Sequence, residues 1–127
     1  MSIHGIDVSG HQGNIDWRKV KASGIQFAML RAGYGANTVD SEFERNAHGC
    51  MEEGIPFGVY WFSYAYTPEM ARREAEKCIS VIREYKVQYP VCYDFEYDSV
   101  RYAQQNGVQV TRTLSTRLVE AFCGRVE

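Results

Sequence analysis

Two carboxylates near the end of an apolar stretch are the residues best placed to do chemistry. Asp94 and Glu96 lie two positions apart in the run 91–96, Val-Cys-Tyr-Asp-Phe-Glu. In a β-strand both side chains would project from one face, with their Cα atoms about 7 Å apart. Mutual repulsion and desolvation by nearby aromatic rings predict a raised pKa for one carboxyl group while the other stays ionised. Such a pair can act on one substrate, and the alternative is an ordinary solvated strand end.

Four apolar runs predict the strands that position this pair. They cover residues 3–8, 26–32, 55–62 and 91–96. The run 26–32 is nearly continuous in apolar residues, which predicts a parallel strand buried on both faces. The run 55–62 is rich in aromatic and β-branched residues, as strands are.

Helix start and stop signals separate the four runs. The predicted N-caps are Asp16, Asp40, Thr67 before Pro68, and Thr111, and the predicted stops are Gly24, Gly54 and Asn106 with Gly107. Capping side chains accept hydrogen bonds from free N–H groups of the first turn, and glycine adopts the left-handed conformation that ends a helix. Strands alternating with helices four times predict an α/β fold of right-handed parallel βα units.

The carboxyl ends of parallel strands share one edge of the sheet, where α/β proteins bind their ligands. Asp7 ends the first predicted strand and is therefore expected beside Asp94 and Glu96. The aromatic residues expected at this edge are Tyr34, Tyr60 and Tyr64, for which core packing is the alternative. Acids and flat rings, with no Lys or Arg beside them in the sequence, favour a sugar site over a phosphate site.

Composition limits the class of protein and its partners. A chain of 127 residues with 45% hydrophobic and 24% charged residues is typical of one globular domain, here residues 1–127. The net charge of -2 gives no reason to expect nucleic acid or an anionic membrane as partner. The chain has no apolar window long enough to span a membrane, and its first residues do not resemble a signal peptide.

The four cysteines do not predict a metal site or a disulfide framework. Cys50, Cys78, Cys92 and Cys123 are irregularly spaced, without a C-x-x-C pair or a His at ligand spacing. We expect buried, reduced thiols, and no metal or other cofactor.

Several segments together resemble the family 25 glycoside hydrolases, the Chalaropsis-type lysozymes. The segments that carry the resemblance are Gly5-Ile-Asp-Val-Ser9, His11-Gln-Gly-Asn-Ile-Asp-Trp17, Arg31-Ala-Gly-Tyr-Gly35, Gly54-Ile-Pro-Phe-Gly-Val-Tyr60 and Asp94-Phe-Glu96. They occur in the family's order. The resemblance implies a modified β/α barrel that hydrolyses the β-1,4 bond between N-acetylmuramic acid and N-acetylglucosamine in peptidoglycan.

The resemblance also implies roles for the acids. Glu96 matches the general acid/base, Asp94 its partner carboxylate, and Asp7 an acid lining the same site. The partner carboxylate either attacks the sugar or orients its 2-acetamido group. Acid/base chemistry of this kind requires no cofactor.

The chain of 127 residues is shorter than a complete barrel of this family, which needs about 200 residues or more. We therefore expect the N-terminal portion of a barrel, truncated to about half, which either flattens into a sandwich or self-associates through its exposed strand edges.

Two functions are expected: a muramidase, or an inactive half-barrel scaffold or weak glycan-binding module. A nucleotide-binding sheet is a third, disfavoured by the lack of a glycine-rich loop leading into a helix. A peptidoglycan substrate implies that the parent protein acts outside the cell or in the cell wall.

Overall fold

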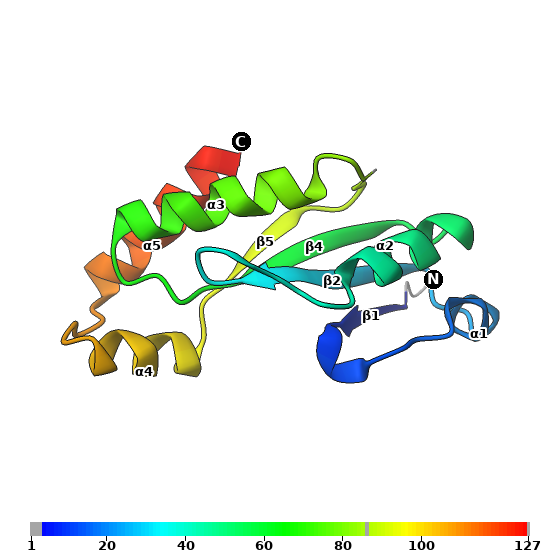
Figure 1. Ribbon diagram of the computed structural model, residues 1–127, viewed down its shortest axis with the longest axis horizontal. Helices are drawn as coiled ribbons and strands as arrows, with labels where there is room; N and C mark the ends of the chain where they lie inside the picture. Colours follow the sequence, from blue (N-terminus) through cyan, green and yellow to red (C-terminus); the bar gives the residue numbers. More distant parts are fainter. Residues whose placement is uncertain (1–3, 86, 127) are drawn as a thin grey trace.

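A mostly parallel sheet forms the centre of the computed structural model, which describes residues 4–85 and 87–126 (Figure 1). Its strands are β1 (Gly5–Val8), β2 (Phe27–Tyr34), β3 (Thr38–Val39), β4 (Phe57–Phe62) and β5 (Val91–Asp94). The parallel order is β1-β2-β4-β5, and β3 pairs with β2 in the antiparallel direction. The four predicted strands and their parallel arrangement are confirmed, whereas the short β3 was not predicted.

Helices follow the strands as the sequence predicts. They are the 3₁₀ helix η1 (Gly10–Gln12) and the α-helices α1 (Trp17–Ala22), α2 (Phe43–Glu52), α3 (Pro68–Ile82), α4 (Tyr97–Gln105) and α5 (Arg112–Val126). Helices α3 and α5 lie side by side, and α4 lies beyond the carboxyl end of β5 (Figure 1). Helix α4 is thus placed where a ligand site at the strand ends would be.

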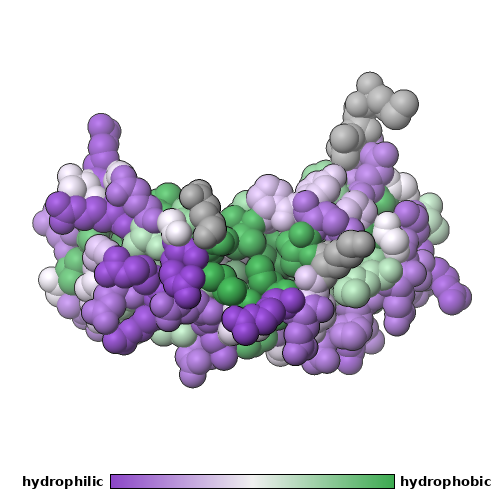
Figure 2. Space-filling model, turned by 90° about the horizontal axis from the view of Figure 1, so that it is seen from above, coloured by the Kyte–Doolittle hydropathy of each residue, from purple (hydrophilic) through white to green (hydrophobic). Residues whose placement is uncertain are grey.

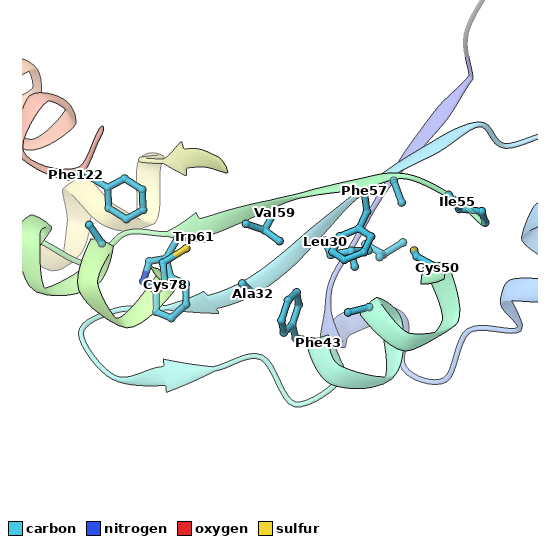
Figure 3. Packing of buried hydrophobic residues seen from close by; sticks show 14 of the residues in the cluster. Leu30, Ala32, Phe43, Cys50, Ile55, Phe57, Val59, Trp61, Cys78 and Phe122 are labelled. Atoms are coloured by element: carbon cyan, nitrogen blue, oxygen red, sulfur yellow. The ribbon is translucent and has the colours of Figure 1, made fainter. Parts of the chain in front are cut away.

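The core lies between one face of the sheet and the helices α2 and α3. Leu30 of β2 and Val59 of β4 are fully buried there, and Phe43 of α2 and Cys78 of α3 pack against the same cluster (Figure 3). Removal of this apolar surface from water stabilises the fold by about 1.5–3 kcal/mol for each large side chain. The core therefore fixes the helices to one side of the sheet.

The opposite face of the sheet is only half-buried. Phe27, Met29 and Arg31 alternate with the buried residues of β2 and retain partial exposure. The prediction that 26–32 is buried on both faces is therefore wrong, because helices cover only the other face. This second face carries the side chains of the candidate site.

The sheet stays open within the described residues, because β1 and β5 each pair with only one strand. Figure 2, a view from above Figure 1 onto the side of α3 and β5, shows hydrophobic residues gathered in a central hollow between hydrophilic flanks. The arrangement is that of consecutive βα units of a TIM-like barrel that is not closed.

Three of the predicted caps are confirmed by their hydrogen bonds. The side chains of Asp16, Thr67 and Thr111 each accept from the backbone N–H group three residues later, at 3.1–3.3 Å. The predicted cap at Asp40 is wrong: α2 begins at Phe43, with Glu42 in the N-cap position. The carboxylate of Asp40 instead binds Gly10, Arg31 and the backbone nitrogen of the N-cap residue Glu42, as described below.

Candidate active site

Three acids meet in one pocket at the carboxyl ends of the strands. The pocket has a volume of about 370 Å³ and is lined by Asp7, Met29, Tyr60, Cys92, Tyr93, Asp94 and Glu96. The structure thus brings together the three predicted acids and one of the three predicted tyrosines. Asp7 comes from β1, Tyr60 from β4 and Asp94 from β5, so the parallel register of the sheet builds the site.

The acid pair spans the end of a strand and the start of a helix. Strand β5 ends at Asp94, so the prediction that the strand continues to residue 96 is wrong. Glu96 is the N-cap residue of α4, and its backbone keeps extended angles, φ -125° and ψ -171°. Because the extended conformation persists, Asp94 and Glu96 still line the same pocket, while Phe95 packs against the core.

The electrostatics of the pair follow the expectation of one raised carboxyl pKa. Burial, a hydrogen bond with Glu96 and repulsion by its charge raise the pKa of Asp94 to about 6. A proton shared by two interacting carboxyl groups belongs to the pair rather than to either residue. The pair can therefore hold one proton at mildly acidic pH, which is what an acid catalyst needs.

Tyr60 links the acid pocket to the first strand. Its hydroxyl donates a hydrogen bond to the carbonyl oxygen of Val8 at 3.4 Å. Burial raises the pKa of Tyr60, the nearby Arg31 partly offsets this, and Asp7 and Asp94 add to the increase. Tyr60 thus stays a neutral hydrogen-bond donor among the acids.

The other two predicted tyrosines line a second pocket. Tyr34 and Tyr64 lie with His11, Arg31, Phe62 and Asp98 around a volume of about 300 Å³, and their ring centroids are 6.3 Å apart. The expected single aromatic wall is therefore divided between two pockets. The pockets adjoin along the sheet, since Arg31 pairs in register with Tyr60.

Arg31 is a site residue that sequence reasoning missed. Its Nε lies 2.7 Å from Oδ2 of Asp40, and its guanidinium carbon lies 4.8 Å from the ring centroid of Tyr34. The sequence argument for a sugar site, which found no Lys or Arg beside the acids and rings, overlooked this cation three residues before Tyr34 in the second pocket. A charged residue within an otherwise apolar strand was the available signal.

The cysteines follow the expectation only in part. Cys50 and Cys78 are buried, and burial raises the pKa of each thiol to about 12. Cys92 is exposed in the acid pocket, because β5 turns it away from the helices, so its predicted burial is wrong. Cys123 is half-buried.

In residues 4–85 and 87–126, no group of three or more His, Cys, Asp or Glu side chains could hold a metal ion, and no helix could cross a membrane.

Comparison with known families assigns the chain to a class of enzymes. The model for glycosyl hydrolases family 25 matches residues 6–125, and the chain belongs to this family. Lysozyme M1 of Streptomyces globisporus is 41% identical over 61 residues, which are 48% of this chain and 21% of that protein.

Solved structures agree with this assignment. A family 25 glycosyl hydrolase from Bacillus anthracis is 28% identical with a TM-score of 0.82, and the match covers 99% of this chain and 55% of that one. The autolysin LytC of Streptococcus pneumoniae, in complex with a synthetic peptidoglycan ligand, is 26% identical with a TM-score of 0.80, over 96% of this chain and 29% of that one. The chain spans about half or less of the length of the curated relatives it matches.

Proposed function

We propose that residues 1–127 form one catalytic domain that hydrolyses the β-1,4 bond between N-acetylmuramic acid and N-acetylglucosamine in peptidoglycan. The observation that carries the proposal is that Asp94, Glu96 and Asp7 line one pocket in a family 25 chain, with the pKa of Asp94 raised by burial and by Glu96. A lysozyme among the relatives and a peptidoglycan ligand bound to LytC support the choice of substrate. The site of action is accordingly the cell wall, outside the cell.

In the proposed reaction Glu96 is the general acid/base. Glu96 is exposed at the pocket, where a glycan can reach it. Its proton passes to the glycosidic oxygen as the bond from that oxygen to C1 breaks, and the resulting carboxylate then takes a proton from the attacking water. Asp7 completes the acidic lining, and no cofactor is required.

Asp94 is proposed to orient the 2-acetamido group of the sugar. Retaining glycosidases with a carboxylate nucleophile hold their two carboxyl groups about 5–5.5 Å apart, and inverting ones about 6.5–9.5 Å. Asp94 and Glu96 line the same pocket, and Glu96 lies near enough to raise the pKa of Asp94. A carboxylate beside the acid/base suits substrate-assisted attack, in which Asp94 holds the 2-acetamido group while the carbonyl oxygen of that group attacks C1 from the face opposite the leaving group.

The tyrosines are proposed to bind the glycan. Tyr60 contributes a hydroxyl donor in the acid pocket, and Tyr34 with Tyr64 offer ring faces and edges in the second pocket. Half-buried rings of this kind present an apolar surface with a polar tip, which suits the mixed apolar and hydroxylated faces of a sugar. Two adjoining pockets match a substrate that is a chain of sugars.

Clearing of a peptidoglycan suspension tests the proposed activity. We expect the native chain to lower the turbidity and Glu96→Gln, which keeps the shape of the side chain, to leave it unchanged. Identical turbidity traces from the two proteins would reject the enzyme. Co-sedimentation of both proteins with peptidoglycan, without clearing, would instead favour a glycan-binding module, and the absence of both would favour an inactive scaffold.

We also propose that the chain self-associates through the edges of β1 and β5, which pair with no further strand within residues 4–85 and 87–126. Unpaired strand edges offer N–H and C=O groups to a second copy, and the hydrophobic hollow beside β5 adds apolar surface to such a contact (Figure 2). Light scattering at micromolar concentration should give a mass of two chains or more. A mass of one chain under these conditions would contradict the proposal.

A further inference from the structure

The carboxyl group of Glu74 is buried outside the two pockets described so far. Glu74 of α3 is 1% exposed, and both of its carboxylate oxygens accept hydrogen bonds. Oε1 lies 2.8 Å from Oγ of Ser63, and Oε2 lies 2.9 Å from the backbone nitrogen of Tyr64. Sequence reasoning missed Glu74, although its position three residues after Ala71 and four before Cys78 places it within the apolar stripe of the helix.

No cation balances this acid among the contacts of the described residues. Tyr93 of β5 faces it, Tyr34 and Tyr102 line the small pocket beside it, and the buried thiol of Cys78 follows four residues later on the same helix. Burial raises the pKa of Glu74 to about 7, although both hydrogen bonds act in the opposite direction. An unpaired buried acid costs free energy, so packing alone does not account for it.

Ser63, the partner of Glu74, is bonded to the segment that carries the acid pair. Its backbone nitrogen donates to the carbonyl oxygen of Asp94 at 2.8 Å, and its carbonyl oxygen accepts from Oγ of Ser99 at 2.6 Å. Its own Oγ lies 2.7 Å from the hydroxyl of Tyr93. Ser63 therefore holds strand β5 and helix α4 at the same time.

The bond between the carbonyl oxygen of Ser63 and Oγ of Ser99 links Ser63 to Glu96 as well. Oγ of Ser99 accepts a hydrogen bond from the backbone nitrogen of Glu96 at 3.1 Å. Ser63 is thus tied to the backbone of Asp94 directly and to that of Glu96 through one side chain. Because Glu74 accepts from both Ser63 and Tyr64, it fixes the end of β4 from which these bonds originate.

We propose that Glu74 is a positioning residue, which acts through Ser63 to set the separation of the Asp94 and Glu96 carboxyl groups. The proposal rests on the proposed hydrolytic function for its consequence in catalysis, but not for its structural content. Loss of the buried carboxyl group should release the end of β4, let the two acids move apart, and so weaken both the hydrogen bond and the repulsion between them.

Carboxyl-carbon NMR titration of the unliganded protein tests this without any turnover. Glu74→Leu should move the titration midpoint of Asp94 down by about one pH unit, as expected for the loss of one carboxyl hydrogen bond. Glu74→Gln should keep the native midpoint, because its amide can accept from Tyr64 and donate to Ser63. Cys78→Ala, a cavity variant on the same buried face of α3, should lower the thermal stability and leave the midpoint of Asp94 unchanged.

Ser63→Ala is the second variant, for use if Glu74→Leu does not fold. It removes the side-chain link and keeps the backbone bonds of Ser63, so it should shift the Asp94 midpoint in the same direction. An unchanged midpoint in a folded Glu74→Leu or Ser63→Ala protein would overturn the positioning role. An equal shift in Cys78→Ala would also overturn it, because the effect would then be general loosening of the core.

Activity measurements separate this proposal from the proposed function. Glu74→Leu should lower the rate of peptidoglycan clearing at saturation about tenfold with little change in KM, and Glu74→Gln should restore most of the rate. If no variant clears peptidoglycan, native chain included, but the midpoints shift as stated, the hydrolytic function fails and the positioning role stands. If clearing is normal and the midpoints are unmoved, the positioning role fails and the function stands.

Discussion

The guanidinium of Arg31 forms an ion pair with Asp40, a carboxylate whose side chain has no exposed surface. Nε of Arg31 and Oδ2 of Asp40 are 2.7 Å apart, and the side chain of Arg31 is itself only 16% exposed. Asp40 also accepts from the backbone nitrogens of Gly10 and Glu42, both at 2.8 Å. One carboxylate thus joins the start of η1, strand β2 and the start of α2 beneath the second pocket.

Replacement of Asp40 by Ala should therefore destabilise the protein strongly. Breaking a buried, hydrogen-bonded ion pair leaves an uncompensated cation and costs about 3–5 kcal/mol. Denaturation by urea measures the loss as a change in the free energy of unfolding. Glu69→Ala is the matched control, because its pair with Arg73 is exposed and should contribute less than about 1 kcal/mol. Similar losses in the two variants would contradict the structural role of Asp40.

The rate of peptidoglycan clearing should fall as the pH rises through about 6. The pair Asp94 and Glu96 holds a single proton below the raised pKa of about 6 and loses it above that value. Without this proton the leaving oxygen has no acid donor, so the basic limb of the pH–rate profile should lie near 6. Asp94→Asn removes the repulsion between the two carboxylates. The basic limb of the pH–rate profile for its residual activity should therefore move to a lower pH. A rate that stays constant from pH 5 to pH 8 would argue against the shared proton.

Stability should also depend on pH through Glu74. The pKa of Glu74 is raised from 4.5 to about 7 in the folded state, so its carboxyl group binds a proton more tightly in the folded protein than in the unfolded chain. The corresponding stabilisation is fully present below pH 4.5 and is lost as the pH rises through about 7, by about 3 kcal/mol in total. Free energies of unfolding measured from pH 4 to pH 8 should decline less for Glu74→Gln than for the native chain. Parallel curves would show that Glu74 titrates normally.

Tyr34 should contribute to glycan affinity rather than to the chemical step. Its ring lines the second pocket, under the guanidinium of Arg31 and away from the acid pair. Loss of one aromatic contact of about 1 kcal/mol should raise KM for soluble glycan fragments roughly fivefold in Tyr34→Ala with kcat nearly unchanged. Tyr89→Ala is the control, since Tyr89 stacks on Phe27 just before β5, away from both pockets. A fall in kcat alone in Tyr34→Ala would place Tyr34 in the chemistry instead.

Local signals in the sequence were reliable where the partners are close in the chain. The caps at Asp16, Thr67 and Thr111 bind backbone N–H groups only three residues away, so each helix start is set by a short segment. Asp40 shows the limit of such signals. It has a capping residue type, but a buried ion pair with Arg31 competes for its carboxylate and is the stronger interaction.

The sequence alone determined the family, the parallel α/β fold, the order of its elements and the acids that line the first pocket. These properties follow from periodicity and from motifs, which are carried by neighbouring residues. The tertiary structure decided that the tyrosines divide between two pockets, that Arg31 joins one of them, and that Glu74 is buried against Ser63. Local patterns mark Arg31 and Glu74 as charged residues at apolar positions, but the partners that these side chains meet depend on which strands are adjacent and which helices cover them.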